Sequence, residues 1–515
     1  MQVSTKRTGI NIVSQWMLHI TNVAVNCFLI GYVIYKVGDE NYGGWASIAS
    51  IIGYLFLLNS GLSNAIQYLI ARFSVNKQNE EMSSVFSAAY VVYGIGACIA
   101  LFICLIVSKY YTVIFTKIPA QAAAECVTAL KWVAPAMMAN LLTMPIQGTI
   151  LGLQSHYVWN IIEVTSLLAR ACVVICSFIY IDPSLSYLGA GYLAAAMTRL
   201  ILGRLALLRL APTIRFHFSL INRESLRNIF SFGGHSALWT ICAVINRESA
   251  PIIAAIYLNA KSATYLYIGV RLVQAIGTFI TNGSVVFVPM TSQLKANNDK
   301  ERLRSALIRG SRFCVLLALS GAAVIFIFGR SVILHWVGIG DKQCYYVVVI
   351  LTFSWMGYWM FSVAHAMLVG LRVLGPITGI MLFRAIFSLA IGLILAKYYG
   401  ILGLVAGIEL PRFLSATLIV PYLACHRMNI SIRKYLGKIL PTPFLIGIIL
   451  SLVSLAIHYI WISTSVWVFL AQGIIVFIVF SVLALWKGLD GMSRRLIIDK
   501  IKMVLIQNRV KQLSK

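Results

Sequence analysis

The residues best placed to do chemistry in this sequence are charged side chains inside long apolar runs. Nine basic and three acidic residues lie in such runs. An arginine near the centre of a bilayer costs about 2.5–3.5 kcal/mol on insertion scales, so such residues are usually paired or functional. Lys131, Arg204 and Arg330 lie near the ends of their runs, where long side chains reach the headgroups. The six mid-run arginines are Arg170, Arg199, Arg247, Arg271, Arg384 and Arg412.

The three acidic residues in these runs, Glu163, Glu248 and Glu409, cannot neutralise six arginines. Glu409 and Arg412 are three residues apart, so they share a helical face and are placed to pair. Glu248 adjoins Arg247, but consecutive helical residues point about 100° apart, so the two need not be partners. A structural ion pair or a snorkelling side chain explains any single arginine. The excess of arginines as a group predicts a water-filled cationic cavity for an anionic ligand, and the guanidinium fork suits phosphate.

Arg247 and Arg271 are the strongest candidates for contact with such an anion. By the helical rise, Arg247 lies about 16 Å and Arg271 about 12 Å from the outer ends of their runs. A short turn joins the two runs, so the helices are neighbours. Two guanidinium groups at similar depth repel each other unless an anion or a carboxylate lies between them. We therefore expect an anion site near this pair.

The elements that must position these side chains are transmembrane helices. The chain has 515 residues, of which 60% are hydrophobic and 11% charged, against about 25% charged in soluble domains. Its net charge is +27, yet the basic residues lack the polar framework of a soluble nucleic-acid binder. Fourteen apolar runs are long enough to span a bilayer: 9–35, 42–71, 83–108, 127–153, 157–181, 187–208, 230–258, 263–290, 313–336, 345–370, 375–398, 401–424, 442–462 and 466–486.

The distribution of lysine and arginine predicts the orientation of the chain. With both termini placed in the cytoplasm, the cytoplasmic segments hold 27 basic residues and the outer turns hold six. Cytoplasmic loops carry the excess of basic residues in membrane proteins. The sequence therefore predicts a multi-pass membrane protein with both termini in the cytoplasm.

A weak internal repeat predicts two pseudo-symmetric six-helix bundles. A shift of 220 residues places Asn26 on Asn246 and Glu81 on Glu301 without a gap. Because six is even, both halves enter the membrane from the same side. The predicted fold is an all-α integral membrane protein with this division: a bundle over 1–210, an amphipathic cytoplasmic linker over 211–228, a second bundle over 229–425, two additional helices over 440–487 and a basic amphipathic tail over 488–515.

Two prolines lie beside the charged positions. Pro251 lacks an N–H and so frees the carbonyl of Arg247, and Pro411 lies between Glu409 and Arg412. Broken backbone is tolerated in a membrane where protein or a cavity satisfies it. We therefore predict that Pro251 and Pro411 kink helices that move around the site.

The sequence carries no soluble catalytic motif: it has no phosphate-binding Gly-rich loop ending in Lys-Ser/Thr and no His-Glu-x-x-His. Cys172 and Cys176 share a helical face without further metal ligands. We therefore predict a transporter rather than an enzyme, with no catalytic residue, no bound metal and no organic cofactor. Transport would then use an ion gradient, the membrane potential or a downhill substrate flux; the coupling ion, H⁺ or Na⁺, stays open.

Three segments resemble a known family. The first combines Asp39-Glu-Asn-Tyr-Gly-Gly-Trp45 with Asn59-Ser-Gly-Leu62. The second is Asn246-Arg-Glu-Ser-Ala-Pro-Ile-Ile253. The third combines Ile268-Gly-Val-Arg-Leu272 with Val286-Phe-Val-Pro-Met-Thr-Ser-Gln-Leu-Lys295. Together they are similar to the Wzx-type O-antigen and capsule flippases of the multidrug/oligosaccharidyl-lipid/polysaccharide (MOP) superfamily.

This resemblance implies that the chain flips undecaprenyl-pyrophosphate-linked oligosaccharides across the inner membrane by alternating access. Arg247 and Arg271 would then contact the pyrophosphate, while Arg384, Arg412 and Arg170 line the cationic lumen. The residues that would couple ions or orient arginines are Glu163, Glu248, Glu409, Asn26 and Asn246. Expected partners are the lipid-linked substrate, membrane lipids, a polysaccharide polymerase and a chain-length regulator, and no nucleic acid.

Three alternatives stay open at this point. A peptidoglycan-precursor flippase of the same superfamily would also be cationic and fourteen-helical. A multidrug cation antiporter needs buried acids, which the intramembrane excess of six positive charges disfavours. A scaffold of a polysaccharide-assembly complex that transports nothing would have no use for buried arginines.

Overall fold

The computed structural model describes residues 5–59, 62–76, 78–221, 223–461 and 466–483, and these residues are helical apart from short turns. In a membrane each backbone N–H and C=O needs a partner within the protein, which the α-helix supplies locally. In the described residues, each of the fourteen predicted runs overlaps helical segments, while positions 60–61, 462 and 484–486 of three runs lie outside the description. The prediction of an all-α membrane protein is therefore confirmed.

Ten described helices are long and apolar enough to cross a membrane, or eleven if the bent pair α12 and α13 is one span. This number is lower than fourteen partly because the stretch 375–427 is one nearly continuous helical segment. The backbone of Gly400 within it has φ 58° and ψ −138°, which breaks the helix. A Cβ on Gly407 would lie 2.7 Å from the Cα of Gly392, so the two legs pack against each other as a hairpin. This stretch therefore holds the two spans that the sequence predicts.

The chain divides into two compact units. Unit 1 contains the described residues up to Tyr267 together with Trp336–Gly338 and Ala396–Leu404. Its elements are α1 (Thr5–Val37), α2 (Asp39–Leu55), η1 (Phe56–Asn59), α3 (Leu62–Val75), α4 (Asn79–Ile114), α5 (Ala120–Gly152), α6 (His156–Tyr180), α7 (Ser186–Leu210), η2 (Phe218–Leu220), α8 (Arg223–Ile253), the π-helical turn η3 (Ala254–Leu258) and the start of α9 (Ala260–Val285).

Unit 2 contains Ile268–His335, Ile339–Leu395 and the described residues from Val405 onward. Its elements are the rest of α9, α10 (Phe287–Ala296), α11 (Lys300–Val337), α12 (Lys342–Met360), α13 (Ser362–Gly370), α14 (Leu374–Leu414), the π-helical turn η4 (Ser415–Ile419), α15 (Val420–Arg427), α16 (Ile432–Ile439), α17 (Pro441–Ile460) and α18 (Val466–Leu483). Residues 484–515 lie outside the described chain, so the predicted basic tail does too. The division into two bundles with a linker stays a prediction.

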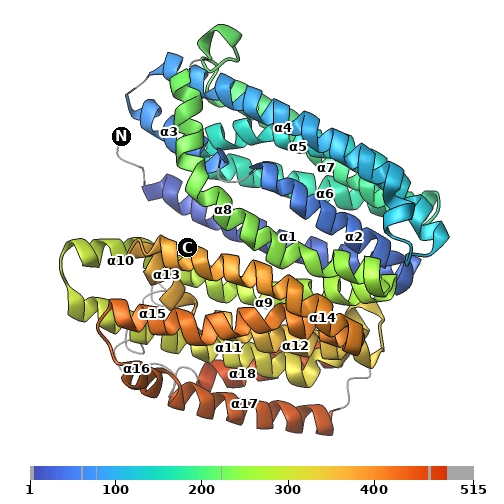
Figure 1. Ribbon diagram of the computed structural model, residues 1–515, viewed down its shortest axis with the longest axis vertical. Coiled ribbons are helices and arrows are strands. Elements are labelled where there is room, and N and C mark those ends of the chain that lie inside the picture. Colours follow the sequence, from blue (N-terminus) through green and yellow to red (C-terminus); the bar gives the residue numbers. More distant parts are fainter. Residues whose placement is uncertain (1–4, 60–61, 77, 222, 462–465, 484–515) are drawn as a thin grey trace, which may run out of the picture. The chain divides into compact units, whose positions relative to one another are not determined.

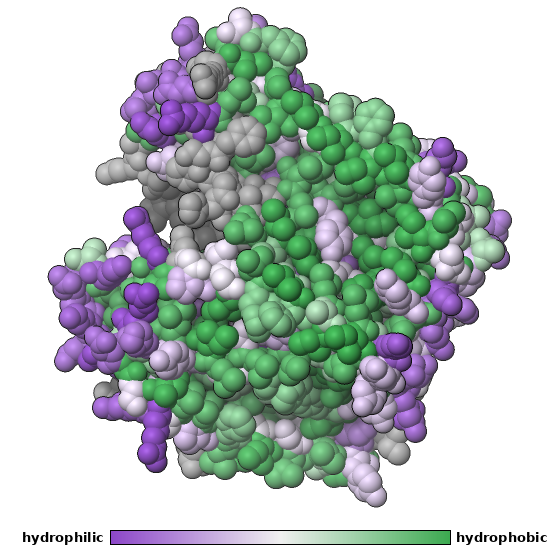
Figure 2. All heavy atoms as spheres, viewed as in Figure 1, coloured by the Kyte–Doolittle hydropathy of each residue, from purple (hydrophilic) through white to green (hydrophobic). Residues whose placement is uncertain are grey.

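Helix α5 is the central helix of unit 1, with α4 and α7 packed along it (Figure 1). In its most apolar window 61% of residues are buried, against 22% for the more hydrophobic α6. The more buried helix is thus the less hydrophobic one, as expected when hydrophobic side chains face lipid rather than a protein core. Figure 2 agrees: hydrophobic side chains cover the middle of the helices, and hydrophilic ones gather near helix ends.

The two prolines singled out in the sequence both lie inside helices, and each is followed by a π-helical turn. Pro251 lies in α8 and precedes η3, while Pro411 lies in α14 and precedes η4. Proline releases the carbonyl one turn earlier, and π turns are a recognised source of helix distortion. The backbone is therefore irregular beside both charged clusters, while the gating role of these prolines stays a prediction.

Candidate functional site

One cluster of polar residues in unit 1 joins α6 to α1 and α7. Arg170 Nη2 donates a long hydrogen bond of 3.4 Å to Asn26 Oδ1, so α1 supplies the partner of this arginine. Glu163 lies on the same helix, but its carboxylate is 4.0 Å from Arg199 on α7. The side chains of Arg199 and Glu163 are 16% and 23% exposed. Asn26, which the sequence places among the orienting residues, thus contacts a predicted lumen arginine.

A second cluster of unit 1 brings α8 against α2. Arg247 Nε donates to Glu248 Oε1 at 2.6 Å, so these neighbours are partners although their backbone positions point apart. The long arginine side chain folds back onto the carboxylate and stays 45% exposed, while Glu248 is 11% exposed. Glu248 packs directly over Gly53 of α2, where a Cβ would overlap its carboxyl group. Tyr54 and Ser249 share a hydrogen bond beside it.

Asn246 of α8, which aligns with Asn26 in the predicted repeat, donates from its side chain to the carbonyl of Cys242 at 2.8 Å. This contact lies within one helix. The bond from Asn26 to the carbonyl of Asn22, also 2.8 Å, has the same four-residue spacing. The two asparagines therefore share a local geometry, while a role in coupling or orientation stays a prediction for both.

The third cluster lies in unit 2 and is deeply buried. Arg412 Nη1 donates to both carboxylate oxygens of Glu409, at 2.6 and 2.7 Å, with 8% and 6% of the two side chains exposed. Ser354 of α12 donates to Glu409 Oε2 at 2.7 Å. The guanidinium of Arg412 also lies 4.6 Å from the ring centroid of Trp355, within cation–π range. The pairing of Glu409 with Arg412 that the three-residue spacing indicates is present.

Arg384 of α14 is a half-buried cation with no carboxylate within 4 Å among the described residues. Its Nε is buried and makes no hydrogen bond within the described residues. It lines a small cavity of about 10 Å³ together with Tyr358 and His365, which is room for about one water molecule. A guanidinium with no directly paired carboxylate is costly in a membrane. The arrangement is chemically suited to hold a water or a small anionic group.

Arg271 of α9 has an exposed side chain, and its Nη1 lies 3.5 Å from Gln274 Oε1. It belongs to unit 2 whereas Arg247 belongs to unit 1. Their predicted proximity therefore stays a prediction. Both side chains are exposed, Arg247 while paired with Glu248.

In the described spans, arginines outnumber the acidic residues that could pair with them. Each of the three acids holds one arginine: Glu163 holds Arg199, Glu248 holds Arg247 and Glu409 holds Arg412. Within the described chain, neither Arg170 nor Arg384 has a carboxylate within 4 Å. The spans therefore keep positive charge after every acid is used.

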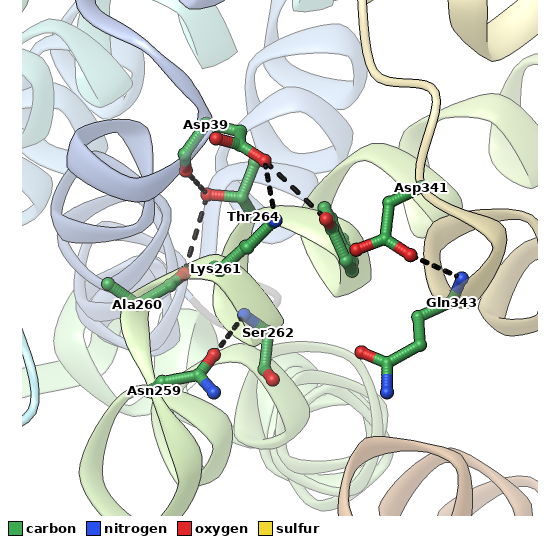
Figure 3. A network of polar contacts seen from close by, with 9 residues as sticks. Asp39, Asn259, Ala260, Lys261, Ser262, Thr264, Asp341 and Gln343 are labelled. Atoms are coloured by element: carbon green, nitrogen blue, oxygen red, sulfur yellow. Dashed lines mark hydrogen bonds and ion pairs between the residues drawn. The ribbon is translucent and has the colours of Figure 1, made fainter.

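A further polar cluster, missed from the sequence, surrounds Asp39 at the start of α2 (Figure 3). Thr264 of α9 donates to the carbonyl of Asp39 at 2.5 Å. Lys261 Nζ lies 3.8 Å from its carboxylate, to which the Tyr265 hydroxyl donates at 3.5 Å. The backbones come close here, because a Cβ on Gly43 would overlap the carbonyl oxygen of Ala260. The presence of Asp39 in one of the family-like segments was the available signal.

Within the described chain, no group of three or more His, Cys, Asp or Glu residues is placed to hold a metal ion. The sulfur atoms of Cys172 and Cys176 lie 3.8 Å apart on one face of α6. The polar chemistry of the described spans is thus dominated by arginine and its partners.

Solved structures with the same fold are transporters. A structure described as lipid II flippase MurJ in an inward closed conformation matches with a TM-score of 0.70 and 12% identity, over 92% of this chain and 97% of that chain. A multidrug resistance MATE family transporter of the MOP superfamily, inward-facing, matches with a TM-score of 0.65 and 13% identity, over 82% and 98%. A MATE transporter, VcmN of Vibrio cholerae, matches with 0.52 and 15%, over 84% and 96%.

The chain is thus a multi-pass membrane protein with the fold of these solved structures. Residues 37–342, more than half of the chain, match the family described as polysaccharide biosynthesis protein, and the chain belongs to that family. No curated protein matches the sequence. The resemblance to flippases of surface-polysaccharide synthesis is therefore confirmed at the level of family and fold.

Proposed function

We propose that this protein flips an undecaprenyl-pyrophosphate-linked oligosaccharide across the bacterial inner membrane for the synthesis of O-antigen, capsule or exopolysaccharide. The observation that carries the proposal is the charge balance of the spans. After Glu163, Glu248 and Glu409 have each taken one arginine, Arg170 and Arg384 have no carboxylate within 4 Å among the described residues. A pyrophosphate supplies the missing negative charge and accepts bidentate hydrogen bonds from guanidinium groups.

The family and the fold support the same proposal. A polysaccharide biosynthesis family needs a step that moves sugars across the membrane, and the MOP fold is found in transporters. In our proposal, transport proceeds by alternating access and is coupled to an ion gradient. The carboxylates of Glu248 and Glu409 hold arginines at 2.6 Å, which favours a role in orienting arginines. The polymerase and the chain-length regulator would act on the flipped product.

An apolar cavity in unit 2 supports a lipid-linked substrate. It has a volume of about 460 Å³ and lies among α9, α11, α17 and α18. Its lining is almost wholly hydrophobic, with Phe279, Phe328 and Phe480 among the residues. In the proposal, this cavity shelters part of the isoprenoid chain while the sugars cross.

The proposal is tested by deletion of the gene and complementation with point variants. Arg247→Ala and Arg271→Ala are expected to abolish the surface polymer while the protein stays in the membrane. Arg204→Ala and Arg330→Ala are the matched controls, because these arginines lie near span ends and should leave the polymer intact. Normal polymer from Arg247→Ala and Arg271→Ala would contradict the pyrophosphate site. Arg→Lys at the same positions should restore only part of the activity if binding is bidentate.

One second candidate is favoured by an observation, the fold match to a lipid II flippase over 92% of this chain. Glycan analysis of the deletion strain separates the two. Loss of one surface polymer with accumulated lipid-linked repeat units supports our proposal. An arrest of cell-wall synthesis with accumulated peptidoglycan precursor would instead support the second candidate.

A further inference from the structure

A large basic cavity lies in unit 2, apart from the intramembrane arginines. It has a volume of about 1110 Å³ and is lined by α9, α10, α11, α16 and the turn that leads into α16. Typical ligand pockets have volumes of about 300–1,000 Å³. The cavity is therefore large enough for a ligand larger than a simple inorganic ion.

The charges around this cavity are almost all positive. One acidic residue, Glu301, faces five basic residues: Arg304, Arg309, Arg312, Lys434 and Lys438. The predicted topology places the start of α11 and the whole of α16 on the cytoplasmic side, at the level of the lipid headgroups. The surroundings thus attract a negatively charged group at the inner membrane surface.

The cavity has a fixed frame. Arg304 donates from Nε to the carbonyl of Met428 at 3.0 Å and from Nη2 to that of Asn429 at 3.1 Å, which ties α11 to the turn before α16. Asn429 has φ 51° in this turn. The buried Tyr435 hydroxyl donates to Ser311 Oγ at 2.7 Å and anchors α16 itself. Because these contacts lie within the protein itself, they hold the cavity wall in place and reduce the ordering required on binding.

Helix α16 is amphipathic, with one face buried against the protein and the other carrying basic residues. Tyr435 and Ile439 are buried, whereas Lys434 and Lys438, one turn apart, are exposed and line the cavity. Phe279, Phe287 and Phe313 are among the apolar residues of the lining. The lining thus combines lysine ammonium groups for an anion with apolar surface for a hydrocarbon.

We infer that this cavity binds the phosphate headgroup of an anionic phospholipid from the cytoplasmic leaflet. The basic residues contact the phosphate, and the aromatic lining contacts the glycerol and the first acyl carbons. A free phosphate ion would leave the apolar lining unused. The segment 487–515 is a poor occupant, because it carries eight Lys or Arg against two Asp and would be repelled. This inference does not depend on the proposed transport function.

The inference is tested with the purified full-length protein in detergent. Tryptophan-monitored thermal unfolding is followed during titration with short-chain phosphatidylglycerol, phosphatidylcholine of the same chain length, and glycerol phosphate. We expect phosphatidylglycerol to stabilise the protein at the lowest concentration. Each basic residue near an anionic lipid contributes about 1 kcal/mol, so Lys434→Gln/Lys438→Gln should weaken binding by about 30-fold. The matched control is Lys342→Gln/Lys397→Gln, two exposed lysines of predicted outer turns.

Three outcomes would overturn the inference. The first is equal affinity for phosphatidylglycerol and phosphatidylcholine, or an equal loss in the control variant, which would mean nonspecific adsorption. The second is glycerol phosphate binding as tightly as phosphatidylglycerol, which would mean a site for soluble anions. The third is phosphatidylglycerol binding that appears once residues 487–515 are removed, which would assign the cavity to the end of the chain itself.

Discussion

Replacing Glu409 by glutamine is the change whose consequence is best defined by the geometry. The carboxylate accepts two hydrogen bonds from Arg412, at 2.6 and 2.7 Å, and a third from Ser354 at 2.7 Å. The glutamine side chain would keep the shape but lose the negative charge. Arg412 would then be a buried cation near Arg384, which lacks a carboxylate partner in the described chain. The variant should therefore be strongly destabilised.

The expected size follows from burial. Removing one partner of a buried ion pair costs about 3–5 kcal/mol, because the other charge is left without compensation. The side chains of Glu409 and Arg412 are 6% and 8% exposed. Glu163 and Arg199 provide an internal comparison, since they are 4.0 Å apart and 23% and 16% exposed. Looser ion pairs with some access to solvent contribute about 0–1 kcal/mol. Glu163→Gln should therefore cost several-fold less than Glu409→Gln.

Both variants would be measured by reversible unfolding in mixed detergent micelles under the same conditions. The double variant Glu409→Gln/Arg412→Gln should recover at least half of the lost stability, because it removes the uncompensated charge. A loss below about 1 kcal/mol for Glu409→Gln, or the same loss for Glu163→Gln, would refute the reasoning from burial.

Two further changes test contacts of unit 1. Gly43→Ala places a Cβ against the carbonyl oxygen of Ala260, and this overpacking should lower the free energy of unfolding by about 1–3 kcal/mol. Gly94→Ala is the control and should leave stability unchanged, because a Cβ there has no atom within 4 Å. The two variants are compared by thermal unfolding. Asn26→Leu removes the hydrogen-bond partner of Arg170 and should lower polymer yield several-fold at unchanged membrane abundance, while wild-type yield would show that Asn26 does not orient this arginine.

The fold was largely predictable because hydrophobicity alone determines which segments enter a membrane. The division at Gly400 between two spans followed from the lengths of the apolar runs, and the structure has its break there. The sequence predicted kinks at Pro251 and Pro411 but not the π-helical turns that follow them. A missing N–H shows where a helix is weakened, but it does not determine the hydrogen bonding of the next turn. Helix α8 begins at Arg223, seven residues before the predicted run, since a polar first turn carries no hydropathy signal.

The contacts of the candidate site were less predictable, because long side chains pair with residues of other helices or through particular rotamers. The three-residue spacing indicated the pair of Glu409 and Arg412. The contact of Glu163 with Arg199 joins two helices and has no signature in sequence spacing. The pair of Arg247 and Glu248 depends on rotamers that position along a helix does not determine. The contacts of Asp39 with α9 join residues more than 200 positions apart, and Asp39 lies between two predicted runs, so neither spacing nor hydropathy indicates them.

The central claim is that the protein moves a pyrophosphate-linked oligosaccharide lipid from one leaflet to the other. Its most direct test is reconstitution of the purified protein into proteoliposomes that contain such a lipid, with a glycan-degrading enzyme added outside. We expect an imposed ion gradient to make the lipid initially in the inner leaflet accessible to the enzyme, and Arg247→Ala to slow this at least tenfold. Equal accessibility with and without the protein would contradict the account.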